Sequence, residues 1–448
     1  MSSHGLSYQR ALPIIILTFV DVLGLTIVVP LLHLYASVYN ATPLQVGLVA
    51  TAFPLAQLIG VPMMGALSDR YGRKPLLLIS QIATCISFLM LAAATSLEMV
   101  ILSRVVDGIF GANFATAQAA MTDLTDEKTR AQGLGLTGAA FGVGFILGPA
   151  IALFALEFTD SLAAPALTAA LYSLISIFLT VFIFRETLPA SHRKGGKPDL
   201  MPVLFNAIHM LRRPQINPLL LLMFLQQIAF FAFESLLGLF MLTRLGFLGT
   251  GSALVFIYIG FILIYVQGRL IGRWSRRYGD RKVMIMALGL LAAGLLLVGL
   301  TPEQPHPLYV RPRAAAELQE LMPSSTEAII GDIETPLPDD SRRGFGGLGW
   351  FLVALIPVGL GAGMLRPALN SLMTKRVHPR ETGAVLGVSA SLSSLANAIA
   401  PLAGGWAFQM YGPSAPFLAG GMLLALLFAL SQRLVRPAER DVEASAVT

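Results

Sequence analysis

The sequence predicts an all-α protein that crosses a membrane many times. Of its 448 residues, 55% are hydrophobic and only 12% are charged, whereas a soluble domain carries about 25% charged residues. The hydrophobic residues form runs of about 20, the length that an α-helix needs to cross the hydrocarbon core. Lys and Arg gather in alternate connections between these runs, which is typical of loops on the cytoplasmic side. These three observations predict a polytopic helical membrane protein.

Twelve apolar runs follow one another along the chain, and each is long enough for a membrane-spanning helix. We place them at residues 11–35, 46–67, 75–95, 98–121, 130–156, 163–184, 218–242, 250–271, 282–301, 347–373, 382–409 and 411–432. The distribution of basic residues places both termini in the cytoplasm. The first run is too long for a signal-peptide core and precedes no small-residue cleavage site, so we expect it to remain as a span.

An internal repeat divides the chain into two halves. Several residues of the first half recur in the second: Gly65, Ser68, Arg70, Tyr71 and Gly72 as Gly272, Ser275, Arg277, Tyr278 and Gly279, and Pro149 as Pro401. The repeat predicts a six-helix bundle over 1–184, a cytoplasmic linker over 185–217, a second six-helix bundle over 218–432 and a cytoplasmic tail over 433–448.

An extracytoplasmic insertion over 302–346 interrupts the second half. It carries eight acidic residues against four Arg, together with many prolines. We expect one short helix near 314–322, but the segment has too little apolar content for a core. The composition therefore predicts a peripheral cap that transport does not need.

The polar connection at 65–75 reads Gly-Ala-Leu-Ser-Asp-Arg-Tyr-Gly-Arg-Lys-Pro. It resembles the loop signature G-x-L-S-D-R-x-G-R-K/R-P of the major facilitator superfamily. The stretch 101–108 resembles the helix 4 signature L-x-x-R-x-x-Q-G of proton-coupled members, with Asp107 in place of Gln. These resemblances imply the major facilitator fold, two pseudo-symmetric bundles that together enclose a central cavity.

Residues of the first and fifth predicted spans resemble one particular branch of this superfamily. Asp21 precedes Val-Leu-Gly-Leu and Pro30 on helix 1, as in twelve-span efflux proteins. Gly135, Gly144, Gly148 and Pro149 fit the helix 5 antiporter signature G-x8-G-x3-G-P-x2-G-G, although Ala152 and Leu153 replace its last two glycines. Over residues 10–155 the chain therefore resembles the tetracycline-efflux-like branch of drug/proton antiporters.

Five charged residues lie within predicted spans, where charge is costly and usually functional. They are Asp21, Arg104, Asp107, Glu234 and Arg366. The resemblance implies that their helices line the central cavity, and we assign them to proton coupling. Arg104 and Asp107 share one helical face and are expected to neutralise each other in part. The alternative is that these charges form structural ion pairs between helices.

Polar and aromatic side chains of the same spans suit amphipathic cargo. We expect the substrate cavity to be lined by Asp21, Gln57, Asn113, Phe114, Gln118, Gln226, Gln227, Phe230, Glu234, Tyr258 and Asn370. The alternative for the aromatic residues is ordinary packing.

A third set of residues is predicted to control gating. It comprises Asp69, Arg70, Arg73, Asp123, Asp280, Lys375, Gly144, Gly148 and Pro149. The repeat aligns Arg73 with Asp280 and Asp123 with Lys375, so the signs are exchanged between the halves. We therefore expect an ion pair between Arg73 and Asp123 and another between Asp280 and Lys375. Asp69 has no acidic counterpart, and we expect it to reach the helix N-terminus near Thr382 when the cytoplasmic side closes.

The sequence contains no P-loop, no zinc-protease motif and no nucleophile elbow. We therefore expect no enzymatic activity, no metal and no cofactor, with protons as the coupling ion. The net charge of +6 comes from basic residues dispersed among short loops, which argues against nucleic acid as a partner. The expected partners are a small-molecule substrate and the lipid bilayer. We expect a monomer in the plasma membrane, which in a bacterium is the inner membrane.

The predicted function is export of lipophilic or cationic small molecules in exchange for protons, by alternating access, as in multidrug efflux and antibiotic resistance. The alternative is a proton-coupled transporter or flippase of a lipid, glycolipid or sugar. A membrane-embedded enzyme or receptor would need a catalytic set or a folded soluble domain, and the sequence shows neither.

Overall fold

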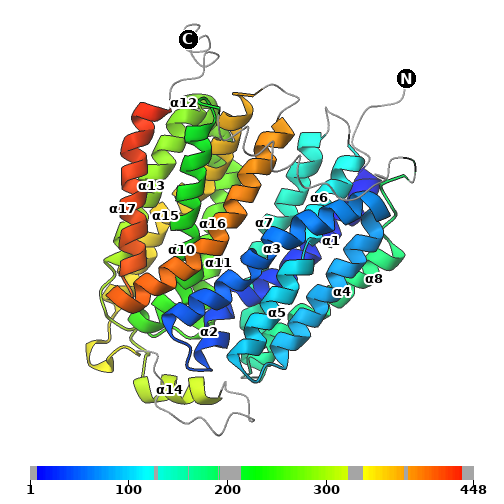
Figure 1. Cartoon of the computed structure of the whole chain (residues 1–448). Helices are drawn as coiled ribbons and strands as arrows, with labels where there is room; N and C mark the ends of the chain where they lie inside the picture. Colours follow the sequence, from blue (N-terminus) through cyan, green and yellow to red (C-terminus); the bar gives the residue numbers. More distant parts are fainter. Residues whose placement is uncertain are drawn as a thin grey trace.

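The structure is a computed structural model that describes residues 8–125, 130–159, 161–189, 191, 213–320, 337–377 and 382–435. Within these ranges the chain is helical and has no β-strand. Figure 1 shows two helical bundles that lean against each other, one from the first half of the chain and one from the second. Most of the predicted linker and tail lies outside the described residues, so their boundaries stay predictions.

The described part of the first bundle contains nine helical elements. They are α1 (Tyr8–Val28), η1 (Val29–Leu31), α2 (Leu32–Ser37), α3 (Pro43–Tyr71), α4 (Arg73–Ala92), α5 (Leu97–Phe110), α6 (Asn113–Asp123), α7 (Arg130–Thr159) and α8 (Ala163–Phe182). The second bundle contains α10 (Asn217–Leu245), α11 (Gly249–Tyr265), the π-helical turn η3 (Val266–Leu270), α12 (Ile271–Tyr278), α13 (Asp280–Gly299), α15 (Phe345–Thr374), α16 (Thr382–Tyr411) and α17 (Ala415–Leu434).

Three predicted spans are not the uniform helices that the apolar runs indicated. The first changes pitch at η1, where Pro30 supplies no backbone N–H. The fourth breaks between α5 and α6 at Gly111, and the eighth contains the wider turn η3. The length of an apolar run predicts the length of a span, but it does not predict local changes in backbone hydrogen bonding such as these turns and this break.

Nine helices among the described residues are long and apolar enough to cross a membrane. The α11 helix and the part of α7 from Gly142 to Leu156 are apolar but shorter. Large apolar side chains are exposed on the bundles, among them Ile59, Phe154 and Phe182, which fits surfaces that face lipid. The helical membrane fold is thus confirmed, whereas the count of twelve spans stays a prediction.

We call the end where α1 begins and α17 ends the cytoplasmic end, following the predicted orientation, and the opposite end the outer end (Figure 1). At the outer end the two bundles touch. A Cβ on Gly47 of α3 would lie 2.3 Å from the carbonyl oxygen of Pro401 on α16. The Leu44 N–H donates to Gln409 Oε1 over 3.3 Å. This backbone-to-backbone packing closes the outer end.

The space around the cytoplasmic ends of α3 and α12 is more open. A Cβ on Gly65 would meet no atom within 4 Å, and one on Gly272 would meet only the tip of the Arg276 side chain at 3.8 Å. The outer ends of the bundles are thus in contact, whereas these inner turns are uncovered.

The described ends of the 302–346 insertion pack more tightly than predicted. Tyr309 is 2% exposed, lies against the backbone of Gly246 and donates its hydroxyl to the Pro338 carbonyl over 3.1 Å. The Gly344 N–H donates to the Pro305 carbonyl over 3.0 Å. One buried aromatic ring thus anchors the described ends of the insertion, and the expectation that the segment has no core of its own stays a prediction.

The insertion also contains the expected short helix. α14 (Arg311–Glu320) begins before residue 314, and residues 321–322 lie outside the described part of the chain. The short helical turn η5 (Asp340–Arg342) precedes α15. That transport does not need the cap stays a prediction.

Candidate functional site

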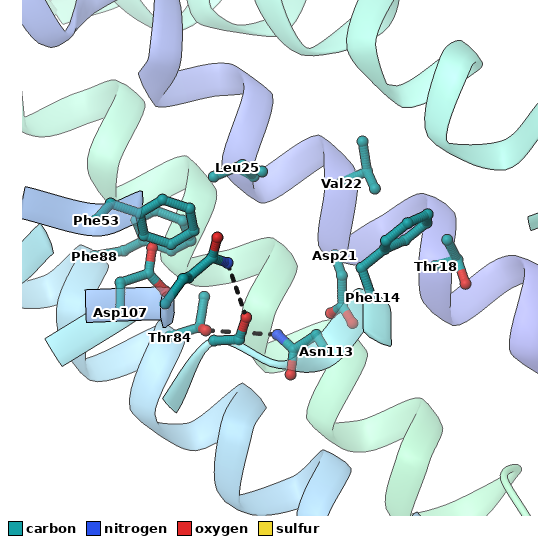
Figure 2. A pocket seen from close by; sticks show the side chains of 12 residues that line it. Thr18, Asp21, Val22, Leu25, Phe53, Thr84, Phe88, Asp107, Asn113 and Phe114 are labelled. Atoms are coloured by element: carbon teal, nitrogen blue, oxygen red, sulfur yellow. Dashed lines mark hydrogen bonds between the residues drawn. The ribbon is translucent and has the colours of Figure 1, made fainter. Parts of the chain in front are cut away.

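A cavity of about 80 Å³ lies inside the first bundle. It is lined by Thr18, Asp21, Val22, Leu25, Phe53, Gln57, Thr84, Phe88, Asp107, Gly111, Asn113 and Phe114, and Figure 2 shows these side chains. A water molecule occupies about 30 Å³ in the liquid, whereas pockets for drug-sized ligands measure about 300–1,000 Å³. The cavity therefore suits two or three waters.

Two carboxylates from different helices line this cavity. Asp21 comes from α1 and Asp107 from α5, and Figure 2 shows both among the cavity side chains. The carboxylate of Asp21 interacts with the side chains of Ser176 and Gln81, and Gln81 Nε2 donates to Ser176 Oγ over 2.8 Å. Polar side chains of α4 and α8 thus position the Asp21 carboxylate.

Asp107 forms an ion pair with Arg104, as their shared helical face predicted. Arg104 Nη1 lies 3.2 Å from Asp107 Oδ2, and the two side chains are 4% and 3% exposed. Arg104 Nη2 donates to Ser87 Oγ over 3.0 Å, and the guanidinium lies 5.5 Å from the centre of the Phe88 ring. The positive charge is therefore fully enclosed within the first bundle.

The break between α5 and α6 turns backbone polar groups toward the cavity. A Cβ on Gly111 would lie 2.2 Å from the Asp107 carbonyl oxygen, so the bend needs glycine. The Gly111 carbonyl accepts a hydrogen bond from Gln57 Nε2 over 3.3 Å. Asn113 Nδ2 donates to Thr84 Oγ1 over 3.5 Å, while its buried Oδ1 has no partner. Such an atom is a hydrogen-bonding position for water.

In the second bundle, Glu234 on α10 interacts electrostatically with Arg366 on α15. Glu234 is half-buried and Arg366 is exposed. Gln227 Nε2 donates to Asn397 Oδ1 on α16 over 2.8 Å. These groups form a second polar region that is separate from the Asp21 cavity.

The predicted cavity residues thus divide between the bundles. Asp21, Gln57, Asn113 and Phe114 line the cavity of the first bundle, together with Asp107. The remaining ones do not line it: Gln118, Gln226, Gln227, Phe230, Glu234, Tyr258 and Asn370. Tyr258 donates its hydroxyl to the Leu352 carbonyl over 3.2 Å, and Phe230 packs against Phe233 with ring centres 5.9 Å apart.

Both predicted ion pairs of the cytoplasmic loops are confirmed. Arg73 Nε lies 2.9 Å from Asp123 Oδ2, and Lys375 Nζ lies 2.7 Å from Asp280 Oδ2. Asp280 also accepts hydrogen bonds from the hydroxyls of Ser275 and Ser371.

Asp69 lies 2.7 Å from Arg73 Nη1 and so belongs to the same cluster. The side chain of Thr382 lies outside the described residues, and the predicted contact belongs to a state with the cytoplasmic side closed. The Arg70 guanidinium lies over the ring of Tyr71, 5.2 Å from its centre. The role of Asp69 in closure therefore stays a prediction.

Glu186 is a structural partner that the sequence did not reveal. Its carboxylate accepts hydrogen bonds from the backbone N–H groups of Arg73 and Lys74, over 2.9 and 3.2 Å. These free N–H groups begin α4, where a carboxylate is favoured. More than one hundred residues separate Glu186 from this helix start, so no local pattern identifies the contact.

The small residues of helix 5 pack closely against helix 1. A Cβ on Gly144 would lie 2.8 Å from Val22 Cγ1, and one on Gly148 would lie 2.0 Å from Thr26 Oγ1. Thr26 Oγ1 also donates to the Gly144 carbonyl over 2.9 Å. Pro149 follows within α7. The contact holds α7 against the helix that carries Asp21.

Comparison with known proteins gives one family match across most of the chain. The model described as "Major Facilitator Superfamily" matches residues 14–311 and 344–447. The chain is 25% identical over 420 residues to "Tetracycline resistance protein, class H" of Pasteurella multocida, covering 92% of this chain and 93% of that protein. It is 23% identical over 438 residues to "Multidrug resistance protein 2" of Bacillus subtilis (strain 168), covering 94% of each.

Solved structures share the fold. The human organic anion transporter MFSD10 (TETRAN) matches with a TM-score of 0.65 and 23% identity, over 95% of this chain and 99% of that one. A D-xylose-proton symporter matches with a TM-score of 0.70 and 14% identity, over 96% and 98%. At these identities the likeness concerns the arrangement of helices alone.

Proposed function

Because the chain belongs to the major facilitator superfamily, we propose that it is a proton-coupled secondary transporter that exports lipophilic or cationic small molecules. It exchanges them for protons by alternating between an inward-facing and an outward-facing state. The chain is a multi-pass membrane protein, and in this proposal both termini lie in the cytoplasm. Its likeness to tetracycline and multidrug resistance proteins supports an amphipathic cargo.

One observation carries the proton-coupling part of the proposal: two carboxylates line a small cavity in the first bundle, and one of them is paired with the guanidinium of Arg104. With Asp21 and Asp107 ionised and Arg104 charged, the net charge of the site is −1. One proton makes it neutral. A neutral site costs less free energy to shield from water than a charged one. Proton binding at this site therefore favours the transport state in which the site is better shielded from water.

The size of the cavity assigns it to protons and water. A volume of about 80 Å³ leaves no room for a drug-sized molecule. The cargo therefore binds between the bundles, where Glu234 and Arg366 provide charge. In this proposal Asp21 couples protons, and Glu234 provides the attraction for a cationic cargo or a second proton site.

The test is transport in proteoliposomes that carry a pH gradient. The wild-type protein should move a hydrophobic cationic dye against its gradient, and Asp21→Asn should abolish the proton-driven part because the amide binds no proton. Glu234→Gln should lower transport as well. Glu98→Gln is the matched control, since Glu98 is exposed at the start of α5, remote from the cavity.

If Asp21→Asn and Glu234→Gln both leave dye transport unchanged, the assignment of proton coupling is wrong. If the same vesicles move labelled lipid, glycolipid or sugar and no dye, the cargo class is wrong while a transport function remains.

A further inference from the structure

His33 lies in the contact between the two bundles at the outer end. It belongs to α2, which packs against α3 and α5 of its own bundle and against α10 of the other. The side chain is 4% exposed. A Cβ on Gly238 of α10 would lie 2.2 Å from His33 Nδ1, so the imidazole occupies the space that any side chain at position 238 would need. Separation of the bundles at this end would uncover the ring.

The imidazole has one unsatisfied nitrogen. The ring interacts with the carbonyl of Pro30, while its buried Nε2 has no hydrogen-bond partner. A neutral ring that donates from Nδ1 to this carbonyl carries a free lone pair on Nε2. This atom is therefore a proton acceptor enclosed within an interface that transport must open.

The groups on the neighbouring first-bundle elements offer no counter-charge for the ring. Tyr35, also on α2, donates its hydroxyl to the Leu162 carbonyl. On α5, Glu98 is exposed at the helix start, and Asp107 is paired with Arg104 at 3.2 Å. The charged residues of α3, Asp69 and Arg70, lie at the cytoplasmic end of that helix.

The facing helix of the second bundle carries two charged residues. Arg244 lies six residues beyond Gly238 and contacts Glu303 and Ser414. Glu234 lies one turn before Gly238 on the same face of α10, toward the middle of the membrane. Glu234 interacts electrostatically with Arg366. An imidazolium in the closed contact would thus be a buried charge whose nearest carboxylate on α10 already interacts with Arg366, and such a charge is costly.

We propose that His33 is an additional proton-binding residue of the transport cycle, placed at the outer gate. When the bundles separate, Nε2 takes a proton from the outer medium, and it must lose this proton before the outer end closes. In this proposal the acceptor is Glu234, one helical turn away on α10: the Nε2–H bond breaks, an O–H bond forms on the carboxyl group, and the imidazole returns to its neutral form. The inference rests on the proposed proton-coupled cycle.

The test measures the separation of the outer ends directly. Spin labels at Thr95 and Leu308, both exposed on the outer end of opposite bundles, report this separation by pulsed electron resonance. The protein should carry Asp21→Asn and Glu234→Gln, so that these carboxylates do not contribute. Between pH 8 and 5 we expect the outward-open population to rise around pH ~6.5, the range of an ordinary imidazole. One linked proton changes the equilibrium constant by up to about tenfold per pH unit.

Adding His33→Gln should remove this pH response while leaving the closed contact polar and of similar size. Gly238→Ala is the matched steric control: the added methyl group displaces the ring, so the outward-open population should be higher than in the parent protein at each pH, while its rise toward low pH is retained. An unchanged pH response in the His33→Gln protein would overturn the proposal.

A second measurement uses the wild-type chain and needs no substitution at position 33. Exchange of the histidine C2 hydrogen, followed by mass spectrometry, reports titration of each histidine separately. We expect His33 to titrate between pH 5 and 8. Absence of its titration would overturn the proposal, and neither readout depends on which cargo the protein moves.

Discussion

Charge reversal at Arg73 tests the cytoplasmic cluster most directly. The guanidinium contacts Asp69 at 2.7 Å, Asp123 at 2.9 Å and Ser68 Oγ at 3.2 Å. Arg73→Asp would replace these attractions by three neighbouring carboxylates. We expect a large loss of stability and of transport, because the loop between α3 and α4 is then no longer tied to the end of α6.

The exposure of the partners sets the magnitude. The Arg73 side chain is 9% exposed, whereas Asp123 is 18% and Asp69 is 30% exposed. Breaking a buried pair costs about 3–5 kcal/mol and breaking an exposed pair about 0–1 kcal/mol. This cluster lies between the two, so we expect Arg73→Ala to cost about 2–3 kcal/mol. Arg73→Asp should cost about 1 kcal/mol more through repulsion.

The assay combines thermal unfolding of the purified protein in detergent with dye transport in vesicles. Arg73→Asp together with Asp123→Arg should restore about half of the lost stability, since one pair forms again while Asp69 faces a new carboxylate. Arg70→Asp is the control for stability, because it makes the same change of charge on an exposed side chain of the same turn. A double variant that inserts normally but recovers neither stability nor transport would refute the pairing argument.

Two further predictions follow from local packing and burial. Gly148→Ala should destabilise the protein by about 1–3 kcal/mol, because the added methyl group overpacks against Thr26. Gly142→Ala on the same helix is the control: no atom lies within 4 Å of the added Cβ, so this variant should unfold at the wild-type temperature. Equal unfolding temperatures for the two variants would contradict the packing argument. Burial holds the pKa of His306 below its usual range, although a hydrogen bond with the Gly246 backbone opposes the shift. Because the folded insertion favours the neutral ring, its stability is full above pH ~6.5 and decreases as the pH falls below that value. After correction for intrinsic exchange rates, amides 303–310 should therefore be less protected from hydrogen exchange at pH 5.5 than at pH 7.5. His306→Phe should remove this difference, because it keeps a ring against Phe247 but has no titrating group. Equal protection of the wild-type amides at both pH values would contradict the argument.

The sequence by itself determined the class of protein and the pairing of its loop charges. Long apolar runs leave the backbone of a membrane protein few options, because each N–H and C=O group must be satisfied within the span. The Arg73–Asp123 and Asp280–Lys375 pairs were predictable because the repeat places them at equivalent positions with exchanged signs. Arg104 and Asp107 were predictable as neighbours because they lie three residues apart on one helix.

Only the tertiary structure decided which faces of separate helices meet. Helical periodicity gives the depth and the face of Asp21, but its shared cavity with Asp107 depends on the way α1, α4 and α5 pack and on the break at Gly111. The contact of His33 with Gly238 likewise joins residues of two different bundles. Such contacts between distant segments depend on the shapes of whole helix surfaces. A sequence pattern within one segment therefore does not predict which surface of another helix it will contact.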